Sequence, residues 1–149
     1  MNILMICTMI QDMGILDKFM KIKYTEYNGK CSIMAFNDEE MWLSTVTIDI
    51  NCDEYPRYKE YCNGDKLAKI IRVETNPNYV GQGIATKLIK NTINKYKEYN
   101  LILLCSPQKR WEDTDTLKTV ADLQMFYSKF GFIKTDELLP TMIRKANIK

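Results

Sequence analysis

The sequence contains no histidine, and this absence removes several kinds of chemistry. Mixed Cys/His zinc sites, Cys–His catalysis and Ser–His–Asp catalysis all need an imidazole, so we expect none of them and no metal. The five cysteines are an odd, widely spaced set without a Cys-x-x-Cys pair. Cys7, Cys31 and Cys105 stand in apolar, strand-like runs, where a free thiol acts as a small hydrophobe. We therefore expect a reducing compartment, the cytoplasm.

Long apolar runs are also missing. No run approaches the ~20 residues that span a bilayer, and the apolar N-terminus has no basic leader of the kind a signal peptide carries. The 21 basic and 19 acidic side chains leave a net charge of +2, too balanced for the extended electrostatic footprint of a nucleic-acid-binding protein. We expect a soluble protein that does not bind membranes, and the balanced charge disfavours nucleic acid as a partner.

The length and composition indicate one folded domain. A chain of 149 residues is near the usual size of a single domain, and no repeat, linker or low-complexity segment interrupts it. Hydrophobic residues make up 46% and charged residues 27%, which are ordinary globular values. We expect a single domain over residues 1–149.

The hydrophobic pattern alternates short strands with helices. Period-two or continuous apolar runs predict strands at 2–8, 31–36, 41–50, 67–75, 101–105, 132–135 and 142–145. Helical spacing predicts helices at 10–27, 83–98 and 120–130, and we expect the turn Asn28-Gly29 to end the first of them. Antiparallel strands thus come first and a β-α-β-α-β unit follows, so the fold class is α/β with a mixed sheet (α+β).

The most informative segment, residues 75–86, joins the strongest strand to an amphipathic helix. Gly81 and Gly83 stand where that helix begins. Glycines let the backbone approach an anion closely, and the first-turn N–H groups of a helix favour a phosphate or pyrophosphate. A plain tight turn is an equally good interpretation of these residues alone. A P-loop is excluded because no Gly-Lys-Ser/Thr follows, and a dinucleotide motif would require glycine at Thr86.

Residues 73–89 resemble the acetyl-CoA-binding motif of the GNAT superfamily, Arg/Gln-x-x-Gly-x-Gly/Ala. Gly83 and Ala85 match its last two fixed positions and Gly81 a frequent extra glycine, whereas Val80 takes the Arg/Gln position. Residues 126–132, with Tyr127, are similar to the family's later run of aromatic-Tyr-x-Lys-x-Gly-Phe. The resemblance implies the GNAT acyl-CoA N-acyltransferase fold and acetyl-CoA (coenzyme A) as cofactor. It implies these cofactor-binding residues: Val73, Thr75, Val80, Gly81, Gln82, Gly83, Ile84, Ala85 and Thr86.

The resemblance also implies an N-acetyltransferase, in which a primary amine of a small molecule or a protein attacks the thioester directly. Glu74, on the strand before the loop, is our candidate base, and an exposed strand glutamate is an equal alternative. Tyr127 matches the family tyrosine near the CoA sulfur and is our candidate acid; alternatively it is a core residue of its helix. The early helix and the 51–66 loop, with Tyr55, Tyr58 and Tyr61, are expected to form the acceptor site, unless these tyrosines merely cover the sheet.

Two other functions stay open. Val80, Val120 and Leu123 depart from the family pattern, and such departures are typical of a catalytically degenerate CoA-binding or protein-interaction module. An acyltransferase acting on nucleic acid is the other alternative, which the balanced charge disfavours and salt-sensitive DNA binding would reveal. The sequence is compatible with a monomer or a homodimer.

Overall fold

The computed structural model describes residues 5–10, 20–51, 59, 61, 66–106, 119–135 and 139–146. Contacts divide the chain into two compact units. The first unit comprises residues 1–51 and 71–96, and the second comprises 52–70 and 97–149. The strand β5 (Lys66–Thr75) contributes its first half to the second unit and its second half to the first.

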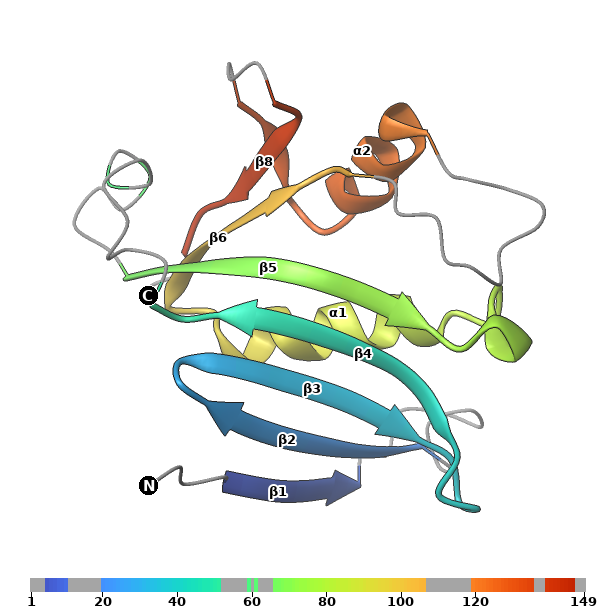
Figure 1. Cartoon of the computed structure of the whole chain (residues 1–149). Helices are drawn as coiled ribbons and strands as arrows, with labels where there is room; N and C mark the ends of the chain where they lie inside the picture. The colour runs from blue at the N-terminus through green and yellow to red at the C-terminus, as the bar shows by residue number, and fades with distance from the viewer. Residues whose placement is uncertain are drawn as a thin grey trace. The chain divides into compact units, whose positions relative to one another are not determined.

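The first unit is built on consecutive antiparallel strands, which Figure 1 shows in blue and cyan. They run in the spatial order β1-β2-β3-β4-β5, and the first four pair antiparallel. After β5 come the 3₁₀ helix η4 (Pro77–Tyr79) and the helix α1 (Ile84–Lys95). The first four strands are β1 (Met5–Ile10), β2 (Lys21–Tyr27), β3 (Lys30–Phe36) and β4 (Trp42–Asp49).

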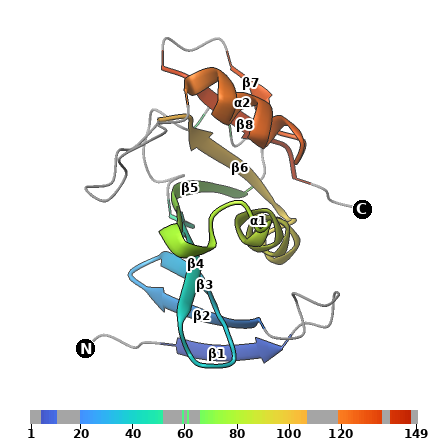
Figure 2. The ribbon, with the colours of Figure 1, turned by 90° about the vertical axis from the view of Figure 1, so that its right-hand side faces the viewer.

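The core of the first unit lies between this sheet and α1. Alternate residues of β3 are buried, as expected for a strand with one covered face. Figure 2 shows α1 beside β3 and β4, and it contacts both of these strands. The hydrophobic residues without solvent exposure in this core are Ile22, Ile33, Ala35, Val46, Ile48, Leu88 and Ile89.

The second unit has the strand order β5-β6-β8-β7, of which Figure 1 labels the first three strands. Lys66–Ile70 of β5 pair in parallel with β6 (Tyr99–Leu104), and the chain passes through α1 between them, since parallel neighbours need a crossover. The strand β8 (Thr141–Arg144) pairs antiparallel with both β6 and β7 (Ile133–Lys134). The helix α2 (Val120–Ser128) precedes β7. The buried residues Leu67, Ile102 and Ile143 form a hydrophobic cluster.

The predicted mixed α/β sheet is confirmed, but the predicted helix at 10–27 is wrong over Lys21–Tyr27, which form β2. Asn28 and Gly29 have φ angles of 50° and 75°, the geometry of a two-residue hairpin turn between β2 and β3. Pairing with β3 buries Ile22 completely, and this tertiary contact outweighs the helical spacing. Residues 11–19 of that predicted helix lie outside the described residues.

The other elements agree with the prediction apart from their ends. The predicted strand at 2–8 is described as Met5–Ile10, the helix at 83–98 ends earlier at Lys95, and the strand at 101–105 begins earlier at Tyr99. Gly131, with φ of 89°, follows α2 as a C-terminal glycine does. Neither helix in the described part of the chain is long and apolar enough to cross a membrane.

Candidate active site

The connection between β5 and α1 changes direction at two glycines. Gly81 and Gly83 have φ angles of 85° and 77°, in the left-handed region that favours glycine. A Cβ atom added at either position would meet nothing within 4 Å. Backbone conformation rather than crowding therefore requires glycine here, and the space in front of both residues is open.

The N-terminus of α1, which follows these two glycines directly, carries backbone donors. Gly83 is the N-cap residue, and no side chain of the described residues caps the helix. Lys87 N donates to Gly83 O at 3.1 Å, so the amides of Ile84, Ala85 and Thr86 precede the first intrahelical bond. The first turn carries no acidic side chain that would repel an anion. Together with the helix dipole, these amides favour a phosphate group.

Asn76 fixes the loop to β4 through both its backbone and its side chain. Its backbone N donates to Leu43 O at 2.8 Å, and its Nδ2 donates to Trp42 O at 2.8 Å. Its Oδ1 accepts from Asn78 N at 3.1 Å, and its carbonyl oxygen accepts from Tyr79 N at 2.9 Å. One residue thus starts η4 and holds it against the neighbouring strand.

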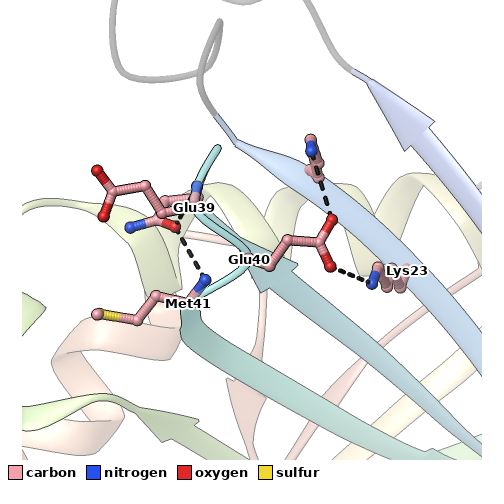
Figure 3. A network of polar contacts seen from close by, with 6 residues as sticks. Lys23, Glu39, Glu40 and Met41 are labelled. Carbon is pink, nitrogen blue, oxygen red and sulfur yellow. Dashed lines mark hydrogen bonds and ion pairs between the residues drawn. The ribbon is translucent and has the colours of Figure 1, made fainter.

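The β3–β4 turn also contacts the loop and is itself held by a network of polar contacts (Figure 3). Asn37 Oδ1 accepts from the backbone N of Glu39 and of Met41, both at 2.9 Å. Met41 Sδ in turn accepts from the Tyr79 hydroxyl at 3.2 Å. Glu40, at φ of 64°, lies 3.6 Å from the Nζ atoms of both Lys21 and Lys23 on β2. The side chains of Asn37 and Glu40 therefore hold the turn, and Met41 joins it to Tyr79 of η4.

Glu74, the candidate base, forms an ion pair with its neighbour on the same strand face. Arg72 Nη1 lies 3.1 Å from Glu74 Oε1, and the two side chains are 56% and 36% exposed. Ser44, which is fully buried, donates from Oγ to Glu74 O at 2.6 Å, and its Oγ lies 3.2 Å from Thr75 Oγ1. The backbone at Glu74 is thus fixed while its carboxylate remains accessible.

Tyr127, the candidate acid, belongs to the second unit. Its ring packs edge-on against Phe126 and Phe132, with ring centroids 5.1 and 6.0 Å away. Burial, and to a smaller extent the nearby Cys105 thiol, raise the pKa of Tyr127 to about 12. The phenol therefore keeps its proton at neutral pH. No hydrogen bond from its hydroxyl is found among the described residues.

The structure places the other predicted site residues in different surroundings. Val80, in the Arg/Gln position of the motif, is 63% exposed. Val73, Ala85 and Thr86 are half-buried, and Ile84 is buried, whereas Gln82 is exposed. Glu74 and all the cofactor-binding candidates belong to the first unit.

The predicted acceptor residues are described only in part. Tyr55 and Tyr58 lie outside the described residues. Tyr61 packs against the hydrophobic cluster of the second unit, and its carbonyl oxygen accepts from Asn100 Nδ2 at 2.8 Å. These contacts favour the alternative in which this tyrosine covers the sheet.

Sequence reasoning missed two residues of the site, Arg72 and Asn76. Arg72 could have been found, since it precedes Glu74 by two positions on a predicted strand and so shares its face. The position of Asn76 before Pro77 is a turn signal, but its contact with Trp42 joins residues far apart in the chain.

The thiols that the structure describes are structural. Cys31 and Cys105 are buried and free, and burial raises the pKa of both. Among the described residues no three side chains of the kinds that bind metal (His, Cys, Asp or Glu) come together in one place.

Comparison with solved structures finds the same fold at low sequence identity. An acetyltransferase from Corynebacterium glutamicum, described as a histone acetyltransferase HPA2 and related acetyltransferase, is 12% identical with a TM-score of 0.57, over 82% of this chain and 67% of its own. The KacTA–DNA complex is 14% identical with a TM-score of 0.55, over 79% and 69%. The NatC complex bound to Gag peptide and CoA is 16% identical with a TM-score of 0.52, over 76% and 69%. The chain thus spans about two thirds of the length of each.

A search of curated protein sequences finds no match. The family model described as "Acetyltransferase (GNAT) family" matches residues 16–132, well over half of the chain. This match and the shared fold confirm the predicted GNAT acyl-CoA N-acyltransferase fold. The chain belongs to the GNAT acetyltransferase family.

Proposed function

We propose that this protein transfers an acetyl group from acetyl-CoA to a primary amine by direct attack on the thioester. The observation that carries the proposal is the uncapped N-terminus of α1, preceded by two left-handed glycines and open space, in a member of an acetyltransferase family. Backbone amides at an uncapped helix N-terminus suit a pyrophosphate. A structural neighbour bound to CoA supports the same ligand class.

The proposed cofactor site uses main-chain groups more than side chains. The amides of Gly81, Gln82, Gly83 and the first turn of α1 would hold the pyrophosphate, so valine at position 80 is compatible with binding. Farther back on β5, the main chain at Val73 and Thr75 would supply the donor for the oxyanion that develops on the thioester carbonyl.

The proposed reaction moves two protons and one acetyl group. Glu74, directly or through water, takes a proton from the ammonium group of the acceptor, and the amine nitrogen then attacks the carbonyl carbon. The new C–N bond forms as the C–S bond breaks, and the CoA thiolate leaves. Tyr127 would give that thiolate its proton, a role suited to a phenol that stays protonated at neutral pH. The nitrogen loses a second proton as the amide forms, and this proton, passed through water, would restore the phenol of Tyr127.

Calorimetry followed by a turnover assay tests the proposal. The purified full chain is titrated with acetyl-CoA and with CoA, and is then incubated with acetyl-CoA and a panel of primary amines, with acetylated products detected by mass spectrometry. We expect binding and acetylated amine. If the protein binds neither acetyl-CoA nor CoA, the proposal is refuted.

The competing proposal is a catalytically degenerate CoA-binding module, which Val80, Val120 and Leu123 favour. Tight binding of CoA with no acetylated product from any amine would support it. An acceptor on nucleic acid is less well supported, because the formal charge is only +2. A structural neighbour in complex with DNA makes salt-dependent DNA binding worth measuring in parallel.

We further propose that residues 1–149 act as one domain, since the family model runs through both compact units. The free, buried thiols of Cys31 and Cys105 support the proposed cytoplasmic location, because a reducing compartment keeps such thiols unpaired.

A further inference from the structure

Arg72 and Glu74 present two opposite charges next to each other on one face of β5. Arg72 Nη1 and Glu74 Oε1 are 3.1 Å apart, and both side chains are accessible. Among the described residues neither charged group has a second ion-pair partner. The pair therefore offers solvent one cation and one anion, held together only by each other.

We propose that the acceptor is a free α-amino acid or a closely similar zwitterion, whose ammonium group contacts Glu74 and whose carboxylate contacts Arg72. This inference rests on the proposed function, because it takes Glu74 as the base of the acetyl transfer. An α-amino acid carries its two charges on groups attached to one carbon. It can therefore replace the single internal ion pair with two pairs to the protein.

The charge of Arg72 argues against an acceptor that is only a cation. Its guanidinium is always protonated, so the field of Glu74 is largely cancelled and a plain ammonium ion would gain little. A plain ammonium ion that displaced the Arg72 guanidinium from Glu74 would also leave Arg72 without an anionic partner. A carboxylate two bonds from the ammonium removes both difficulties, because it can accept two parallel hydrogen bonds from the guanidinium fork.

Opening the internal pair costs little. Exposed ion pairs contribute little to stability, and this one lies between two partly exposed side chains of the same strand. The backbone beneath is fixed by the Ser44 hydrogen bond, so the strand need not move when the side chains separate.

The same arrangement favours release of the product. Glu74 accepts one proton from the ammonium group, and the nitrogen forms a bond to the acetyl carbon and loses its second proton to water. The thiolate leaves with the electrons of the C–S bond and takes up a proton. The product amide has no positive charge for Glu74, which loses its proton to water and can pair with Arg72 again. The N-acetyl amino acid then has only its carboxylate to hold it.

Matched acceptors test the inference with the full chain and acetyl-CoA. Leucine is compared with leucine amide and 3-methylbutylamine, which keep the amine and lack the carboxylate, and the same comparison is made for one aromatic, one acidic and one basic amino acid. The amide carries the less basic amine, so a site indifferent to the carboxylate would acetylate it at least as fast. We expect at least one of the four amino acids to be acetylated with a kcat/KM at least about tenfold above that of its amide and its amine.

Variants of Arg72 assign the preference to this residue. Arg72→Gln is expected to lower kcat/KM for the preferred amino acid about 10- to 100-fold, as for loss of a charged hydrogen bond. It is not expected to lower kcat/KM for the matched amine, because that amine then no longer competes with a guanidinium for Glu74. Arg72→Lys keeps the charge without the fork and is expected to restore part of the loss. Lys30→Gln removes a positive charge from an exposed position at the start of β3 and is expected to change neither rate.

The outcomes separate this inference from the proposed function. If amines are acetylated and every amino acid reacts no faster than its amide, or if Arg72→Gln affects acid and amine alike, the zwitterion inference is refuted and acetyl transfer stands. If no amine or amino acid is acetylated, the zwitterion inference fails as well, and CoA titration then decides between a binding module and a chain that does not use CoA.

Discussion

The side-chain amide of Asn76 donates a 2.8 Å hydrogen bond to the carbonyl oxygen of Trp42, and this bond ties the proposed cofactor loop to β4. Trp42 is the first residue of β4 and Asn76 follows the last residue of β5. The backbone bond from Asn76 to Leu43 lies beside it. The loop therefore starts from a fixed point, which positions the glycines that follow η4.

Asn76→Ala is expected to weaken cofactor binding because it removes both side-chain bonds of this residue. We expect the affinity for acetyl-CoA to fall about tenfold while kcat at saturation changes little, and the free energy of unfolding to fall by about 1–2 kcal/mol. Calorimetry, steady-state kinetics and urea unfolding measure these three quantities.

The control is Asn91→Ala, which removes the 2.6 Å bond between the Tyr24 hydroxyl and Asn91 Oδ1 in the same unit. It is expected to lower stability without changing affinity. Equal affinity losses in the two variants would show that Asn76 acts only through stability.

Gly83→Ala is expected to lower both stability, through backbone strain, and CoA affinity, through loss of the anion site. Alanine at φ of 77° costs about 1–2 kcal/mol, and its methyl group enters the open space at Gly83, which the proposed pyrophosphate would occupy. We expect CoA affinity to fall at least about tenfold, as measured by calorimetry. Gly131→Ala is the matched control, since φ there is 89° and the added Cβ would lie 3.4 Å from Arg144 Nε. The proposed pyrophosphate site would be contradicted if both variants lost similar stability and Gly83→Ala still bound CoA with unchanged affinity.

Local patterns predicted the loop and most of the sheet. Gly81 and Gly83 mark the turn and the apolar stripe marks α1, because both signals depend only on neighbours in the chain. The β2–β3 hairpin does not follow from local patterns although Asn28-Gly29 is a strong hairpin signal, because the apolar spacing before it favours a helix. Ile22 satisfies either period, and only its burial against β3 decides between them.

Contacts between segments far apart in the chain do not follow from local sequence patterns. The bond from Asn76 to Trp42 depends on which strand lies beside β5, and the Ser44 hydroxyl reaches Glu74 O for the same reason. The ion pair of Arg72 and Glu74 was within reach of sequence reasoning, since strand alternation alone puts both on one face.

Tyr127→Phe tests the proposed acid while sparing the packing of the ring. If the hydroxyl protonates the leaving thiolate, kcat should fall about 10²- to 10⁴-fold. Acetyl-CoA affinity is expected to be unchanged, and so is the melting temperature at pH 7. Tyr27→Phe removes a hydroxyl from a 44%-exposed side chain of β2 and should leave kcat as it is. An unchanged kcat in Tyr127→Phe would make Tyr127 a core residue only.

The raised pKa of Tyr127 predicts a loss of stability in alkali that the phenylalanine variant lacks. The pKa is about 12 in the folded protein and about 10 in the unfolded chain, so the unfolded state loses this proton first. The contribution of Tyr127 is complete below pH 10 and decreases as the pH rises toward 12. The full difference of about two units corresponds to roughly 3 kcal/mol.

Urea unfolding of the wild type and of Tyr127→Phe at pH 8.5, 10 and 11 isolates this effect, because the lysines and the other tyrosines titrate alike in both proteins. The wild type should lose about 1 kcal/mol more than the variant by pH 11. Parallel pH profiles would mean that the hydroxyl is solvated and titrates normally. The same solvated hydroxyl would still protonate a thiolate, so Tyr127→Phe kinetics and this profile test the acid and its burial separately.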